Sequence, residues 1–79
     1  MNYASGMSRT LRLAEEVRVE AARKRVTMST LAQGAGMTYQ TLRRRLAGTY
    51  PFTVDELERV ASVLGVTVTD LNSRTEVAA

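Results

Sequence analysis

A six-residue unit, apolar–Thr–x–x–x–Leu, occurs four times in this 79-residue chain. Threonine at the N-cap of a helix accepts a hydrogen bond from a backbone N–H that otherwise lacks a partner. The apolar residue before it and the leucine four positions after it hold the two sites of a hydrophobic staple. The pattern therefore predicts four helix starts. The units are Val26-Thr27 with Leu31, Met37-Thr38 with Leu42, Phe52-Thr53 with Leu57, and Val66-Thr67 with Leu71.

Glycines predict where three of the helices end. Gly36, Gly48 and Gly65 each follow a predicted helix, at the position where left-handed backbone closes the last turn. A further helix is predicted upstream, because Leu13, Val17 and Ala21 form an apolar stripe at helical spacing. The predicted helices cover residues 9–24, 28–35, 39–47, 54–64 and 68–73.

The predicted core follows from the same spacing. It comprises Leu13, Val17, Ala21, Val26, Leu31, Ala32, Ala35, Met37, Leu42, Leu46, Phe52, Leu57, Val60, Ala61, Leu64, Val66 and Leu71. No segment shows the pattern of a strand. The expected fold is all-α, a compact five-helix bundle of one domain, with a helix-turn-helix unit in its second and third helices.

The composition excludes several classes of function. Cysteine and histidine are absent, so no disulfide, no thiolate or imidazole metal site and no Ser–His or Cys–His pair can form. We expect no cofactor, no metal, no small-molecule ligand and no enzymatic activity. No apolar run reaches membrane-spanning length and no signal peptide is recognised, so we expect a cytoplasmic protein without membrane contact.

Charge is distributed unevenly along the chain. Residues 9–45 hold nine basic and three acidic side chains, whereas residues 46–79 hold two basic and five acidic ones. A basic half of this kind favours a polyanionic partner, although a solvated surface with ion pairs such as Glu20–Lys24 accounts for the same counts. The third predicted helix is more specific. Its face opposite Leu42 and Leu46 carries no acid and presents Tyr39, Gln40, Arg43, Arg44 and Ala47.

The stretch 17–71 resembles the lambda-repressor-like helix-turn-helix family, which includes phage Cro proteins and repressor DNA-binding domains. The residues that carry the resemblance are Val26-Thr27, Leu31-Ala32, Gly36-Met37-Thr38, Leu42, Gly48, Leu57, Ala61, Leu64-Gly65-Val66 and Leu71. The resemblance implies a DNA-binding domain over residues 9–74, between an N-terminal tail (1–8) and a C-terminal tail (75–79). It also implies a double-stranded DNA operator as the partner, in a bacterial or phage-infected cell.

The resemblance assigns roles by position. Base reading in the major groove is expected from the third helix, where Gln40 can pair with adenine and an arginine with guanine. The expected base-reading residues are Thr38, Tyr39, Gln40, Arg43 and Arg44. The expected phosphate-binding residues are Thr27, Ser29, Arg18, Arg23, Arg45, Thr49 and Tyr50. By its angular position, Arg45 lies beside the core edge, so it is expected to contact a phosphate or an acid such as Glu58.

Two positions depart from the family pattern. Met28 stands where the family often has a phosphate-binding glutamine, and Arg25 where it usually has glycine. Arg25 is strained if its φ is positive, and otherwise ends the first helix differently. Whether either residue contacts DNA is left open.

The expected function is a sequence-specific transcriptional regulator, Cro-like or a small repressor. The alternative is a protein-interaction module of the same fold, an antitoxin or accessory subunit, with DNA binding secondary. A homodimer, in solution or only on DNA, is expected to use the fifth helix, the tail, or the apolar residues Val54, Val68 and Val77.

Overall fold

The structure, a computed structural model, describes residues 9–77 and the side chains of residues 9–75. Its helices are α1 (Arg9–Arg23), α2 (Met28–Gly34), α3 (Tyr39–Leu46), α4 (Val54–Leu64) and α5 (Val68–Val77). This part of the chain contains no strand, which agrees with the all-α prediction. The predicted tail 1–8 lies outside the described residues.

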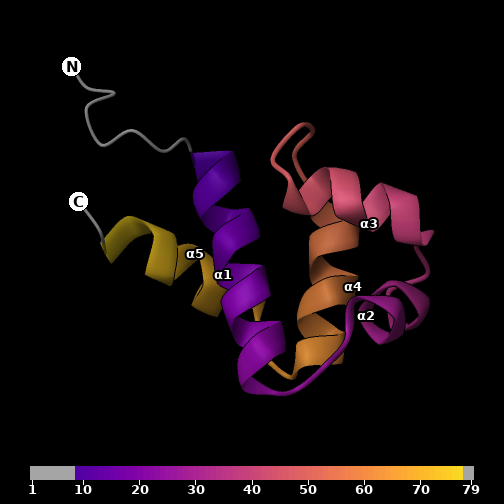
Figure 1. Cartoon of the computed structure of the whole chain (residues 1–79). Helices are drawn as coiled ribbons and strands as arrows, with labels where there is room; N and C mark the ends of the chain where they lie inside the picture. Colours follow the sequence, from indigo (N-terminus) through magenta and orange to yellow (C-terminus); the bar gives the residue numbers. More distant parts are fainter. Residues whose placement is uncertain (1–8, 78–79) are drawn as a thin grey trace.

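The other three helices pack around α1 and α4. These two helices contact each other, α2 and α3 pack on one side of them, and α5 packs on the other side (Figure 1). The helix-turn-helix pair thus lies at one end of the bundle. Consequently α3 has one face in the core and the opposite face in solvent.

All four predicted threonine caps are formed. Each threonine Oγ1 accepts a hydrogen bond from the backbone N–H three residues later, at 3.0–3.1 Å. At Thr53 the Glu56 carboxylate accepts the return bond from the cap N–H at 3.0 Å, which completes a capping box. Asp70 does the same for Thr67 at 3.0 Å. The helix starts are therefore set by local side-chain chemistry.

The first four helices end in one shared turn, in which the residue after a left-handed position donates a backbone hydrogen bond to the carbonyl five residues earlier. These bonds measure 2.9–3.3 Å. Gly36, Gly48 and Gly65 hold the left-handed position as predicted, with φ of 68°, 78° and 75°. In α1 the same position is taken by Arg25, with φ of 59°. The suggestion that Arg25 ends α1 differently is therefore wrong, because its backbone adopts the conformation that favours glycine.

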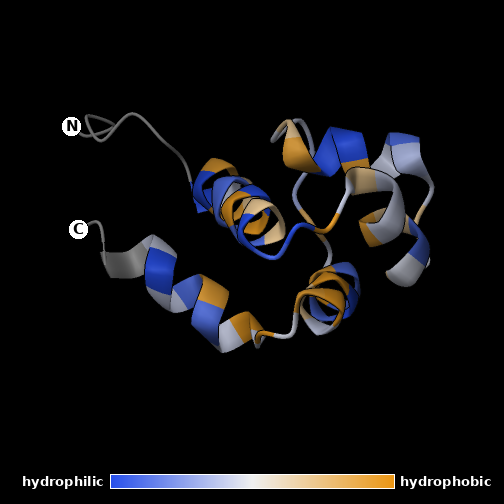
Figure 2. Cartoon of the chain, turned by 60° about the horizontal axis from the view of Figure 1, so that its bottom comes forward, coloured by the Kyte–Doolittle hydropathy of each residue, from blue (hydrophilic) through white to orange (hydrophobic). Residues whose placement is uncertain are grey.

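Every predicted core residue is buried or packs against the buried cluster. The leucines of the four recurring units are buried, and the apolar residues that precede their threonines are half-buried against the same cluster, as a staple requires. The sequence analysis missed Ala14, which is buried, and Met28, Val63 and Val68, which pack against the cluster. Figure 2 shows hydrophobic and hydrophilic residues alternating along the helices, as expected of amphipathic helices around one core.

Helix α5 continues to Val77, past the predicted end at residue 73 and into the segment predicted as a tail. Contacts to α1 account for the difference, because the Arg74 guanidinium lies 2.8 Å from a carboxylate oxygen of Glu20. Thr75 is buried, and its hydroxyl donates to the Asn72 carbonyl at 2.7 Å. Tertiary packing therefore extends a helix whose sequence shows little amphipathic pattern.

Glu20 is a buried carboxylate in the apolar stripe of α1. The predicted pair with Lys24 is formed at 3.2 Å, but it lies at the α1–α5 contact and not on a solvated face. Hydrogen bonds from Arg74 and Lys24 lower the pKa of Glu20 against the opposing effect of burial. Lys24 also donates to the Leu64 carbonyl at 2.7 Å, which ties α1 to the end of α4.

Candidate nucleic-acid interface

Helix α3 is held to the molecule by two leucines. Leu42 is 0% and Leu46 is 6% exposed, and both belong to the core cluster. On the opposite face Gln40, Arg43 and Arg44 are exposed, as the helical spacing predicts. The core contacts of α3 therefore determine which of its side chains reach solvent.

The outward face of α3 forms a shallow depression with the residues that follow the helix. Gln40, Arg43 and Arg44 line it together with Ala47 and Thr49. Among the described residues, no side chain pairs with the polar groups of Gln40, Arg43 or Arg44. Three groups with hydrogen-bond donors thus converge on an open surface, and two of them carry positive charge.

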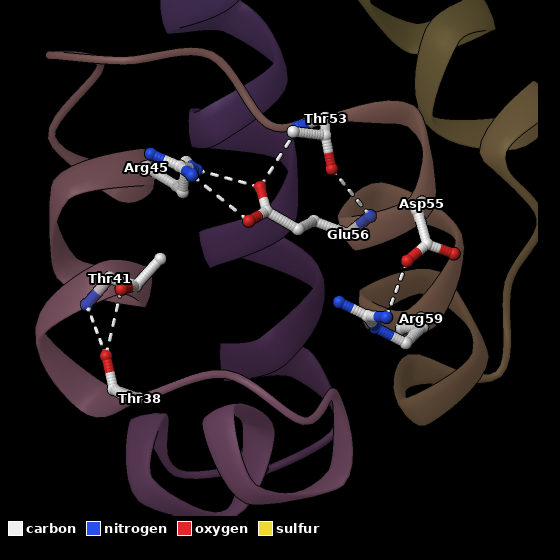
Figure 3. Close-up of polar contacts among 7 residues, drawn as sticks. All are labelled: Thr38, Thr41, Arg45, Thr53, Asp55, Glu56 and Arg59. Atoms are coloured by element: carbon white, nitrogen blue, oxygen red, sulfur yellow. Dashed lines mark hydrogen bonds and ion pairs between the residues drawn. The ribbon is translucent and has the colours of Figure 1, made fainter.

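Thr38 and Tyr39 lie at the N-terminal end of α3, outside this depression. The Thr38 hydroxyl is the helix cap: it accepts from the Thr41 backbone N–H at 3.0 Å and donates to the Thr41 hydroxyl at 2.9 Å (Figure 3). Tyr39 is 49% exposed and follows directly. Thr38 thus already uses its hydroxyl proton within the helix, whereas the Tyr39 hydroxyl has no described partner.

The expected phosphate-binding hydroxyls are exposed at two places that flank α3. Thr27 and Ser29 lie at the start of α2, where Thr27 donates to the Thr30 hydroxyl at 3.0 Å. Thr49 and Tyr50 lie in the loop after α3, and Tyr50 is 55% exposed. All four therefore remain open to a ligand.

Met28, the first residue of α2, is half-buried and packs against the core. Its side chain supports the helix-turn-helix unit from within. Met28 therefore packs inward, and its side chain lacks the amide group of the glutamine that the family often has at this position.

Two of the three arginines expected at phosphates make contacts within the protein that brace α3. Arg18 of α1 donates to the Leu46 carbonyl, at the C-terminal end of α3, at 2.8 Å. Arg45 forms a two-bond ion pair with Glu56 of α4, at 2.8 Å from Nε to Oε1 and 3.0 Å from Nη2 to Oε2 (Figure 3). The third, Arg23, bonds Glu20 at 3.3 Å and keeps a side chain that is 62% exposed.

The acid that Arg45 contacts is Glu56 and not Glu58. Glu58 is exposed, whereas the Glu56 side chain folds back toward the start of α4 to close the capping box and so meets α3. The sequence analysis found Glu56 only as a capping residue. Nothing in the local pattern indicates its second role, because the two partners are eleven positions apart.

Both groups of this ion pair are mostly shielded from water, with Arg45 18% and Glu56 14% exposed. The hydrogen bond from Arg45, aided by the bond from the Thr53 backbone, lowers the pKa of Glu56 to about 2. The same bond raises the pKa of Arg45. Near neutral pH the pair is therefore fully charged.

Within the described residues, no group of three or more acidic side chains is placed to hold a metal ion. No helix within residues 9–77 is long and apolar enough to cross a membrane.

Residues 16–76 match the family described as Cro/C1-type HTH DNA-binding domain. The match extends from the middle of α1 into α5 and includes α2, α3 and the loop between α3 and α4. No curated protein and no solved structure matches the chain.

Proposed function

The chain belongs to the Cro/C1-type HTH DNA-binding domain family, and from this premise we propose that it is a sequence-specific transcriptional regulator, Cro-like or a small repressor. It binds double-stranded DNA and reads the major groove with α3, in a bacterial or phage-infected cell. The observation that carries the proposal is the outward face of α3, on which Gln40, Arg43 and Arg44 are exposed and have no side-chain partner within the part of the chain that the structure describes.

The proposed base readers act through the geometry of their side chains. Arg43 and Arg44 each offer two parallel N–H donors that match guanine O6 and N7, and the Gln40 amide matches adenine N6 and N7. Tyr39 reaches a thymine methyl or a phosphate, and Thr38 lies close enough to the helix start to contact a neighbouring base or phosphate. These contacts supply sequence discrimination.

The proposed phosphate contacts lie on both sides of α3. Thr27 and Ser29 bind the DNA backbone from the start of α2, and Thr49 and Tyr50 bind it from the loop after α3. Arg23 adds positive charge from α1. Such contacts set the register of the protein on the duplex without reading sequence.

We further propose that two copies bind one operator. Val54, at the start of α4, supports this proposal because it is 76% exposed, the most exposed large apolar side chain among the described residues. Val68, expected to share this role, packs against the core of its own chain, and the side chain of Val77 lies outside the described residues.

The test is selection of duplexes from a random-sequence pool, followed by titration of the selected site at several salt concentrations. The slope of log K against log salt should be negative, by about 0.9 for each phosphate that an arginine neutralises. Enrichment of one sequence with such a slope supports the proposal. A pool that stays random, with acidic proteins retained by the same arginine face, would support the interaction-module alternative instead.

A further inference from the structure

The ion pair between Arg45 and Glu56 spans the loop that joins α3 to α4. Arg45 is the penultimate residue of α3, and Glu56 belongs to the first turn of α4. Residues 47–53 lie between these helices and include Thr49 and Tyr50. The pair therefore closes the loop at its base, with two hydrogen bonds between groups that are largely shielded from solvent.

Glu56 connects three parts of the molecule through one carboxylate. Its Oε1 accepts from Arg45 Nε at 2.8 Å and from the Thr53 backbone N–H at 3.0 Å, while Oε2 accepts from Arg45 Nη2 at 3.0 Å. Figure 3 shows the carboxylate between the Arg45 side chain and the Thr53 backbone. The end of α3, the end of the loop and the start of α4 are thereby held in one arrangement.

Helix α3 needs such a support because its other attachments are few. It is eight residues long, about two turns, and only Leu42 and Leu46 of its side chains are buried. Besides the Arg45–Glu56 pair, its one side-chain hydrogen bond to another helix among the described residues comes from Arg18, which donates to the Leu46 carbonyl at the C-terminal end of α3. Apolar contacts along one line resist rotation about the helix axis weakly, because they are not directional. The Arg45–Glu56 bonds are directional and act on the flank of the helix, next to Arg44.

We propose that Glu56 is a positioning residue for base discrimination: through Arg45 it fixes the rotation of α3 and the path of loop 47–53, without touching DNA. The inference rests on the proposed function of α3. Bidentate recognition of a base requires good alignment, since hydrogen bonds weaken steeply when misaligned. A small rotation of α3 therefore costs discrimination more than it costs sequence-independent attraction to phosphates.

The effect of Glu56→Gln separates positioning from simple electrostatics by its sign. Glutamine keeps the size of the side chain and remains a capping-box residue at this position, so it can still accept from the Thr53 N–H. It removes one negative charge from a DNA-binding protein, which by electrostatics alone raises affinity for DNA. The proposal predicts the opposite for the selected site.

The matched control is Asp55→Asn. The substitution removes the same charge at the residue before Glu56. The Asp55 side chain, however, is 72% exposed, and its ion pair among the described residues is with Arg59, also in α4. Its substitution should leave base discrimination unchanged and alter affinity by no more than about twofold, because exposed charges are screened.

The experiment titrates wild-type protein, Glu56→Gln and Asp55→Asn against the duplex that wild-type protein selects and against a scrambled duplex. Thermal melts confirm that each protein is folded at the titration temperature. We expect Glu56→Gln to lower the ratio of specific to non-specific affinity by about tenfold, between the effects of exposed and buried pairs. In an Arg45→Met background the same substitution should have no further effect on this ratio.

Three outcomes are distinguishable. Wild-type protein that binds neither duplex overturns the proposed function and this inference with it. If wild-type protein discriminates and Glu56→Gln discriminates equally well, the proposed function stands and the positioning role is overturned. If Glu56→Gln instead binds both duplexes more tightly, with a salt slope steeper by about 0.9, Glu56 only withholds Arg45 from a phosphate and the inference is likewise wrong.

Discussion

Arg25 adopts a backbone conformation that favours glycine. Its φ of 59° closes α1 with the same turn that glycines form at the ends of α2, α3 and α4. A residue with a Cβ atom costs about 1–2 kcal/mol of folding free energy in the left-handed region. Glycine avoids this strain but gains only part of it as stability, because a glycine loses more conformational entropy when the chain folds. We therefore expect Arg25→Gly to raise the free energy of unfolding by about 0.5–1 kcal/mol, measured by urea denaturation.

Gly36→Ala makes the opposite change, from glycine to a residue with a side chain, at the equivalent left-handed position after α2. Gly36 has φ of 68°, and a Cβ atom there would meet nothing within 4 Å, so its substitution isolates the backbone strain. It should lower stability by about 1 kcal/mol. An unchanged or lower denaturation midpoint for Arg25→Gly would mean that the arginine side chain contributes contacts that outweigh its strain.

The pH dependence of stability should report on Glu56. Its pKa is about 2 in the folded protein, below the ordinary value of 4.5 expected on unfolding. Its contribution is therefore fully present above about pH 4.5 and is lost as the pH falls through the folded value. We expect the stability difference between wild-type protein and Glu56→Gln to be largest near pH 7 and to approach zero near pH 2. A difference that stays constant between pH 7 and pH 2 would show that the Glu56 carboxylate is not stabilised by folding.

The threonine caps determine where helices begin, and they could be predicted because the chemistry of a cap lies within four consecutive residues. The glycines that end three helices, and the spacing of apolar residues that marks the core face of each helix, are also local features of the sequence and could be predicted. The end of α5 could not be predicted in this way, because the contact of Arg74 with Glu20 joins residues 54 positions apart. Local signals set helix starts here, whereas distant contacts set how far the last helix runs.

Helix α5 offers a direct test of capping. Thr67→Ala removes the hydroxyl that accepts a hydrogen bond from the Asp70 backbone N–H, with 3.0 Å between Thr67 Oγ1 and Asp70 N. The substitution should lower the free energy of unfolding by about 1 kcal/mol. Thr69→Ala, two residues later on an exposed position, should change stability by less than about 0.5 kcal/mol. Urea denaturation of both variants checks this, and equal effects would show that the Thr67 hydroxyl does not stabilise the helix.

Across the whole molecule, the charge counted from the sequence overstates the number of bases that are available to a ligand. Residues 9–45 carry a net charge of +6, but Lys24 and Arg45 are held in ion pairs within the protein. Periodicity correctly predicted that Arg43 and Arg44 are exposed and that Arg45 lies at the core edge. It could not identify the partners of Arg18 and Arg45, because these depend on how α1, α3 and α4 pack together.

Whether the outward face of α3 reads base sequence is decided by the base preference of arginine variants. Arg43→Ala and Arg44→Ala are titrated against the selected duplex with each base pair changed in turn. Arg59→Ala, an exposed arginine on α4 outside the proposed interface, is the control. We expect each α3 variant to lose about 1–3 kcal/mol on the selected site and to discriminate less at one base pair, with the Arg59 variant unchanged. If Arg43→Ala and Arg44→Ala both keep the full wild-type base preference, α3 does not read the DNA.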